Sequence, residues 1–299
     1  MEHRPDTDRT PDAHQGLLVS EKPLVHPSGW GDSNSRPLVP QTSALTKLRH
    51  SPYACGAGTL SRLSAVPRTI DQVTTEPPES PTTLVLIRHG ESNVTVNRVI
   101  GGYRSCNGLS TLGRQQAERL RERLARTSEL TADVLISSNF LRAIETAEAI
   151  APSLSDLDIE VDPGFGEHDP GPEIDGMTFA EYVERFGTPD WAGDPHHEVF
   201  PGGETTAEFH LRVGAAISRT LRTHAGRTVV VACHGGVVDV AFRHLLRLSP
   251  VGAFELSTLN TSITEFRLAP SGAWRLARYN DAAHLDGLPA ETPRTPATL

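Results

Sequence analysis

The chain has 299 residues, of which 28 are Lys or Arg and 37 are Asp or Glu, giving a formal net charge of −9 at pH 7. A chain of this length can bury the core of one or two domains. Its acidic total disfavours nucleic acid and anionic membrane surfaces as partners, because both bind surplus Lys and Arg. No apolar run approaches the roughly 20 residues that cross a bilayer, and the N-terminus does not resemble a signal peptide. The composition therefore predicts a cytoplasmic protein.

Residues 1–80 differ in composition from the rest of the chain. They hold both lysines, Lys22 and Lys47, and 10 of the 23 prolines, and they show no sustained apolar periodicity. Such a segment cannot bury enough apolar surface to offset the entropy of ordering, so we predict that it is disordered. An alternative interpretation is a misplaced translation start, because residues 29–52 resemble peptides read through a transfer-RNA gene.

From residue 82 onward, short apolar runs alternate with helical periodicity. Apolar, β-branched runs predict strands over residues 82–88, 132–138 and 227–233, with two more strands around a Pro-Ser-Gly turn in 262–280. Apolar spacing predicts helices over residues 110–127, 139–151, 178–187, 205–224 and 237–248. In the helix over 139–151, the predicted buried stripe is Leu141, Ile144, Ala147 and Ile150. This alternation predicts the α/β class, with a mostly parallel central sheet flanked by helices on both faces, in three layers.

Two histidines come directly after predicted strands. His89 and His234 each precede glycine, in LVLIRHG and VVVACHGG. In open α/β sheets, ligands bind at the carboxyl ends of strands, and glycine lets the backbone approach a ligand closely. We therefore predict a site at this edge, under a loop-rich insertion over residues 162–204. Cys233 precedes His234 on its strand, so its side chain is expected to point to the opposite face and pack in the core.

Six sequence blocks occur in the order typical of one family. They are RHGES (88–92), LSTLGRQQA (109–117), SSNFLRAIETA (137–147), EHDPG (167–171), PGGET (201–205) and CHGG (233–236). Through these blocks the chain resembles the histidine phosphatase superfamily, in its phosphoglycerate-mutase-like branch, over roughly residues 82–279. The resemblance implies a histidine phosphatase catalytic domain over residues 81–282, followed by a flexible C-terminal tail over 283–299.

The resemblance also implies the roles of five residues in phosphoryl transfer. His89 is the expected nucleophile, which attacks as neutral imidazole when its other ring nitrogen donates to a backbone carbonyl. The phosphoryl oxygens would be bound by Arg88 and Arg142, since guanidinium groups match such oxygens bidentately, and by His234 as a second imidazole. Glu167 would protonate the leaving alkoxide and then activate water. No cofactor and no metal ion are expected.

The substrate-binding residues expected from the same motifs are Arg88, Thr95, Arg142, His234 and Gly235. Thr95 stands where many relatives carry Asn. Its hydroxyl, or the amide of Asn93 or Asn97, is therefore expected to make the remaining phosphate contact. Glu91 and Glu204 also fit their motifs, and we expect them to pair with Arg or backbone N–H groups.

These motifs predict a phosphomonoester hydrolase that acts through a covalent phosphohistidine on His89. Two alternatives are a phosphoglycerate-mutase-type phosphotransferase and a non-catalytic module that binds a phosphorylated ligand. The 67 residues from Glu167 to His234 are too few for the longer insertion of mutases in this family, which favours the hydrolase. The expected partner is a small phosphorylated substrate. Its specificity is assigned to the loop over residues 169–203, which carries Trp191, His196, His197 and Phe200.

Overall fold

The computed structural model of the chain describes residues 80–252 and 254–292. The predicted disordered segment lies outside the described residues up to residue 79, as do residues 293–299 of the predicted tail. None of the helices within the described residues is both long and apolar enough to cross a membrane.

Six strands form one sheet, in the spatial order β3-β2-β4-β1-β5-β6. Pairing is parallel from β3 to β1, whereas β1 with β5 and β5 with β6 are antiparallel. Arg88 in β1 lies in register with Cys233 in β4, so the next residues, His89 and His234, leave the sheet as neighbours at its carboxyl edge. The strands are β1 (Thr83–Arg88), β2 (Val134–Ser137), β3 (Ile159–Val161), β4 (Thr228–Cys233), β5 (Ile263–Leu268) and β6 (Trp274–Asp281).

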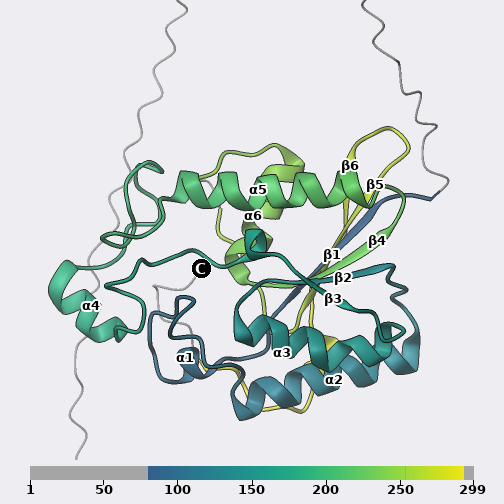
Figure 1. Cartoon of the computed structure of the whole chain (residues 1–299), viewed down its shortest axis with the longest axis horizontal. Helices are drawn as coiled ribbons and strands as arrows, with labels where there is room; N and C mark the ends of the chain where they lie inside the picture. The colour runs from purple at the N-terminus through teal and green to yellow at the C-terminus, as the bar shows by residue number, and fades with distance from the viewer. Residues whose placement is uncertain (1–79, 253, 293–299) are drawn as a thin grey trace, which may run out of the picture. The chain divides into compact units, whose positions relative to one another are not determined.

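Helices cover both faces of the sheet. Helices α2 and α3 pack on one face, and α5 and α6 pack on the other (Figure 1). This arrangement confirms the predicted α/β class with a mostly parallel sheet between two helical layers. The helices are α1 (Asn93–Val96), α2 (Thr111–Thr127), α3 (Leu141–Ile150), α4 (Phe179–Phe186), α5 (Thr206–Thr223) and α6 (Gly235–Leu246).

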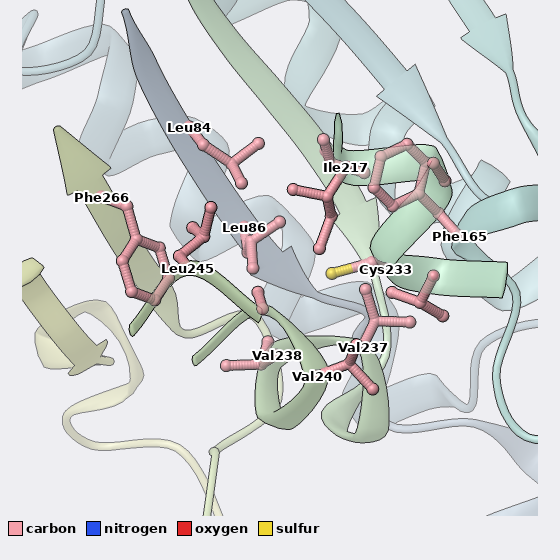
Figure 2. Packing of buried hydrophobic residues seen from close by; sticks show 14 of the residues in the cluster. Leu84, Leu86, Phe165, Ile217, Cys233, Val237, Val238, Val240, Leu245 and Phe266 are labelled. Carbon is pink, nitrogen blue, oxygen red and sulfur yellow. The ribbon is translucent and has the colours of Figure 1, made fainter. Parts of the chain in front are cut away.

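Alternate side chains of β1 enter two separate cores. Leu84 and Leu86 pack with side chains of α5 and α6, whereas Val85 and Ile87 pack with those of α2 and α3. Full burial of one such side chain contributes about 1.5–3 kcal/mol. Figure 2 shows the first core, in which Cys233 is fully buried among aliphatic and aromatic side chains. Burial raises the pKa of its thiol, and the prediction of a core cysteine is confirmed.

The α2–α3 side of the domain differs from the sequence prediction in two details. Strand β3 was not predicted, because it has only three residues, and these are partly or fully exposed. The predicted buried stripe of α3 was partly wrong, since Leu141 is 42% exposed. The buried face of α3 instead includes two polar side chains, which turn it toward the candidate site. Its members are Arg142, Ala143, Thr146, Ala147 and Ile150.

Residues 283–292 pack on the domain, which differs from the predicted flexible tail. His284 is buried in a short 3₁₀ turn over Ala283–Leu285, and its Nε2 lies 2.8 Å from the Thr261 hydroxyl. Further along, Glu291 accepts a hydrogen bond of 2.5 Å from the Asn260 backbone N–H. Isolated polar contacts of this kind leave no apolar periodicity in the sequence, which is why this segment resembled a tail.

Candidate active site

His89 lies at the carboxyl end of β1, where hydrogen bonds define its tautomer. Its Nδ1 lies 2.6 Å from the carbonyl oxygen of Gly90, which can only accept, so Nδ1 carries the proton. The lone pair is therefore on Nε2, which accepts a hydrogen bond of 3.1 Å from Nε of Arg142. Burial, and then the charge of Arg142, lower the pKa of His89 to about 3. The ring is thus neutral at pH 7, with its Nε2 lone pair directed at the arginine.

Arg142 is held from the first turn of α3, with hydrogen-bond donors to spare. The Thr146 hydroxyl donates to its carbonyl at 2.7 Å and accepts from the Gly90 N–H at 3.1 Å, which joins α3 to the segment after β1. The guanidinium carbon lies 4.6 Å from the centroid of the Phe140 ring. Nη1 is buried and has no hydrogen-bond partner among the described residues. A buried cationic donor without a partner is suited to an anionic ligand.

Arg88 is the second buried guanidinium beside His89. Its Nη1 donates to the carbonyl oxygen of Thr258 at 2.6 Å and lies 4.0 Å from the Glu291 carboxylate. Its Nε is buried and, within the described part of the chain, unpartnered. Nη1 of Arg88 is therefore held by Thr258 and Glu291, while its Nε can still donate.

His234 forms the N-cap residue of α6 and contacts the ring of His89, with ring centroids 5.0 Å apart. Its Nε2 lies 2.7 Å from the Ser138 hydroxyl, whereas its buried Nδ1 is unpartnered among residues that the structure describes. Burial, followed by the charges of Arg142 and its other neighbours, holds the pKa of His234 well below the usual value. The ring is therefore neutral at pH 7, and a bound dianion would shift its pKa upward.

Glu167 lies in the loop-rich insertion and reaches the same site. Its carboxylate accepts hydrogen bonds from the backbone N–H groups of His168, at 3.1 Å, and Gly236, at 3.2 Å. A Cβ at position 236 would approach the carboxylate to 2.3 Å, so a larger residue there would displace the Glu167 side chain from this position. The pKa of Glu167 is raised because protein surrounds the carboxyl group, although one side of the side chain faces the pocket. The group can therefore hold a proton at higher pH than an exposed glutamate.

These residues enclose a cavity of about 70 Å³. At the 10–15 Å³ that one water needs, it has room for about five to seven non-hydrogen atoms. That is enough for a phosphoryl group and the first atoms of its leaving group. His234 does not line the cavity itself but contacts His89 behind it. The lining residues are Arg88, His89, Ser92, Val94, Thr95, Val99, Ile100, Gly101, Arg142, Glu167, His168, Pro170, Trp191 and Phe200.

A family model described as the histidine phosphatase superfamily (branch 1) matches residues 84–282. The chain belongs to this superfamily. It is 30% identical over 206 residues to phosphoglycerate mutase-like protein 4 of Arabidopsis thaliana, with coverage of 68% of this chain and 86% of that protein. It is 27% identical over 213 residues to metal-independent phosphoserine phosphatase of the same plant, with coverage of 69% and 84%. Among solved structures, Bacillus stearothermophilus YhfR is 27% identical, with a TM-score of 0.59 and coverage of 69% of this chain and 100% of YhfR.

Thr95, which stands where many histidine phosphatases carry Asn, lies at the cavity. Its hydroxyl lies 3.0 Å from that of Ser92. The Asn93 amide instead donates to the carbonyls of Asn107 and Leu109, at 3.3 and 3.2 Å. Thr95 is thus better placed for a ligand than Asn93. Gly235 is the first residue of α6, and its role in binding the substrate stays a prediction. The next backbone N–H, that of Gly236, donates a hydrogen bond to the Glu167 carboxylate.

Only some residues of the loop over 169–203, to which we assigned specificity, line the cavity. Pro170, Trp191 and Phe200 line it. His196 and His197 of the same loop are exposed and do not line it. The predicted roles of Glu91 and Glu204 as partners are confirmed. Glu91 accepts from the Ser110 hydroxyl and the Thr292 N–H, and Glu204 accepts two hydrogen bonds from Arg212.

Several residues that contact the site were not predicted from the sequence. The Asn260 amide donates to the carbonyl of His89 at 2.7 Å, and Glu291 lies beside Arg88. Neither belongs to one of the six blocks, so no local signal indicated them. Ser138 lies in one of the blocks but was not assigned to the site, although its position directly after β2, the neighbour of β4, could have placed it beside His234. Within residues 80–252 and 254–292, no group of three or more His, Cys, Asp or Glu side chains could hold a metal ion.

Removing the charge of Glu291 is expected to tighten anion binding. Its carboxylate lies 4.0 Å from Nη1 of Arg88 and repels an anion bound to the other side of that guanidinium. We expect Glu291→Gln to lower the Kd for inorganic phosphate about threefold to tenfold in calorimetric titration. Asp286→Asn removes an equal charge from an exposed position of the same segment, so it should leave the Kd within about twofold. An equal change in both variants would contradict a local effect at Arg88.

Proposed function

We propose that the chain hydrolyses small phosphomonoesters through a covalent phosphohistidine on His89. The observation that carries this proposal is the fixed tautomer of His89. Its Nδ1 proton is held by the Gly90 carbonyl, and the Nε2 lone pair faces Arg142 inside the cavity. A neutral imidazole with an oriented lone pair is a competent nucleophile, and the adjacent guanidinium groups attract the phosphoryl group to it.

Binding uses the donors that are unpartnered without a ligand. Arg142 turns from Nε2 of His89 to the phosphoryl oxygens, which frees the lone pair, and Nε of Arg88 donates from the other side. His234, which lies outside the lining but against the His89 ring, keeps Nδ1 as a spare donor, because the Ser138 hydroxyl can donate to its Nε2. The dianion then raises the pKa of His234 and favours its protonated form.

The reaction proceeds in two displacements at phosphorus. In the first, Nε2 of His89 forms a bond to phosphorus, the ester P–O bond breaks, and the Glu167 carboxyl group gives its proton to the leaving alkoxide. In the second, the Glu167 carboxylate takes a proton from water, whose oxygen attacks phosphorus while the P–N bond breaks. Inorganic phosphate leaves, and His89 and Glu167 regain their starting states. No metal ion takes part.

The cavity favours water over a second phosphorylated ligand as the acceptor. The relatives carry both kinds of name, phosphoglycerate mutase-like and phosphoserine phosphatase. A mutase must hold a further anionic group, yet the only cations lining the cavity in the described part of the chain are Arg88 and Arg142. Both are used on the phosphoryl group that is transferred. Hydrolysis therefore fits the charge of this site better than transfer.

Trapping of the intermediate tests the proposal. The wild-type protein is mixed with a ³²P-labelled phosphomonoester, with and without EDTA, and quenched in alkali. We expect label that is stable in alkali and labile in acid, on the peptide that contains His89, with the same yield in EDTA. Label that is stable in acid, or label on a peptide without His89, would overturn the mechanism.

Ser138 is expected to act as a positioning residue for His234. Ser138→Ala leaves the buried Nε2 of His234 without its partner at 2.7 Å, at a cost of about 1–3 kcal/mol. We expect kcat/KM for p-nitrophenyl phosphate to fall about tenfold to hundredfold and its pH profile to shift. Ser137→Ala is the matched control, since the Ser137 hydroxyl donates only to the adjacent Ser138 carbonyl. Equal losses in the two variants would show a general effect on packing.

A further inference from the structure

One wall of the cavity carries polar atoms that the proposed reaction does not use. His168 and Trp191 both line the cavity, with ring centroids 5.0 Å apart. The His168 residue is only 6% exposed, and neither ring nitrogen makes a well-formed hydrogen bond with a described residue, although the Glu204 carbonyl lies near the ring. The indole Nε1 of Trp191 is likewise buried and, among the described residues, unpartnered. Each such group costs about 1–3 kcal/mol unless a ligand or water satisfies it, so this wall points to a polar ligand group.

The protonation of this wall limits what it can bind. Burial lowers the pKa of His168 to about 4, outweighing the opposing effects of the Glu204 carboxylate and carbonyl. The ring is neutral at pH 7 and therefore offers one N–H donor and one lone pair. Trp191 adds a second donor. A hydroxyl group, which both donates and accepts, can satisfy a neutral imidazole and an indole together.

The charge of the cavity excludes a second anionic group. Among the described residues, Arg88 and Arg142 are the only cations in the lining, and their two charges match a phosphoryl dianion. The rest of the lining holds no cation: it consists of apolar side chains such as Val94 and Ile100, the two neutral rings, and the side chains of Ser92, Thr95 and Glu167. A carboxylate placed there would be removed from water without a cation to pair with, which is strongly unfavourable.

We propose that His168 and Trp191 form a leaving-group subsite for an uncharged, hydroxyl-bearing alcohol, so that the substrates are phosphomonoesters of neutral polyols. This inference rests on the proposed hydrolase function and narrows it. The subsite selects against esters whose leaving group carries a carboxylate and against esters whose leaving group lacks hydroxyls. Both properties follow from the same pair of side chains.

Three esters of similar length test the subsite. Glycerol 3-phosphate carries hydroxyls, 3-phosphoglycerate has a carboxylate in place of the terminal hydroxymethyl group, and propyl phosphate has neither. We expect kcat/KM for glycerol 3-phosphate to exceed that for each of the other two by at least about tenfold. An equal or higher value for 3-phosphoglycerate or for propyl phosphate would overturn the proposal.

Variants of His168 and Trp191 test whether their rings cause the preference for glycerol 3-phosphate. In His168→Phe, the ratio of kcat/KM for glycerol 3-phosphate to that for propyl phosphate should fall at least about tenfold, because the ring keeps its bulk but loses both nitrogens. Trp191→Phe, which removes one donor, should lower the ratio about threefold to tenfold, and it decides the test if the first variant does not fold. His197→Phe changes an exposed histidine of the same loop and should keep the wild-type ratio. Wild-type ratios in both His168→Phe and Trp191→Phe would overturn the subsite.

The same data separate the two levels of the proposal. If the wild type hydrolyses p-nitrophenyl phosphate in a reaction that requires His89 but does not discriminate among the three esters, the subsite is wrong and the hydrolase stands. If no phosphomonoester is hydrolysed, both are wrong.

Discussion

Replacing His89 with alanine is expected to lower kcat/KM for p-nitrophenyl phosphate by at least about 10⁴-fold. Alanine removes the Nε2 atom that attacks phosphorus in the proposed mechanism, and water in its place would meet no oriented base in the first displacement. The Gly90 carbonyl and Nε of Arg142 would lose their shared partner, but the fold around them is held by separate hydrogen bonds through Thr146. Steady-state kinetics and the labelled-phosphate experiment should both show the loss.

Binding measurements distinguish a lost nucleophile from a lost site. Because Arg88 and Arg142 remain in His89→Ala, inorganic phosphate should still bind, with a Kd within about tenfold of the wild-type value. His197→Ala, which removes an exposed histidine, should keep full turnover. Retention of more than about one per cent of activity in His89→Ala, with a normal unfolding transition, would refute the covalent mechanism.

The sequence predicted the parts of the site that follow strands directly. His89 and His234 were placed at the carboxyl edge because each ends an apolar, β-branched run, and the register of β1 with β4 brings them together. The resemblance to the histidine phosphatases added Arg142 and Glu167, and the structure brings both to the same cavity. Strand patterns and motif blocks are local signals, so these predictions needed no knowledge of distant contacts.

The remaining contacts depend on tertiary structure. Ser138 and His234 are 96 residues apart in sequence, and Glu291 reaches the Asn260 N–H across 31 residues. No periodicity encodes such pairs, because each is fixed only once the sheet has formed. The same reason explains the error in α3. Amphipathic periodicity assigns the buried face of a helix to apolar residues, but the buried face of α3 contains Arg142, whose side chain lines the cavity.

The buried arginines also explain how an acidic protein can bind an anion. The net charge of −9 is spread over the chain, and exposed charges farther than the Debye length of about 8 Å are largely screened at physiological salt. Arg88 and Arg142 are buried beside the proposed phosphoryl position, where a single charge pair at 4 Å would be worth about 4 kcal/mol at an effective dielectric constant near 20. Local geometry therefore outweighs the total charge.

Glu167→Gln is expected to lower kcat for glycerol 3-phosphate, whose alkoxide leaving group needs a proton, about 10²- to 10⁴-fold, the range typical of a lost general acid and base. The amide keeps the shape of the side chain and one acceptor for the N–H groups of His168 and Gly236, but it can neither give nor take a proton. Glu173→Gln is the matched control, because Glu173 is an exposed acid six residues away and its replacement should leave kcat unchanged.

The raised pKa of Glu167 gives this prediction a pH signature. Burial favours the protonated carboxyl in the folded protein, so the acid form needed for the first displacement is lost as pH rises through the raised folded pKa. The wild-type kcat/KM should therefore fall on that alkaline side, and the fall should disappear in Glu167→Gln. The stability contributed by the same shift is fully present below the unfolded pKa and is lost as pH rises through the folded pKa. Denaturant titrations should accordingly show Glu167→Gln gaining stability relative to the wild type as pH rises through that range, and a constant difference between the two proteins would contradict the assignment.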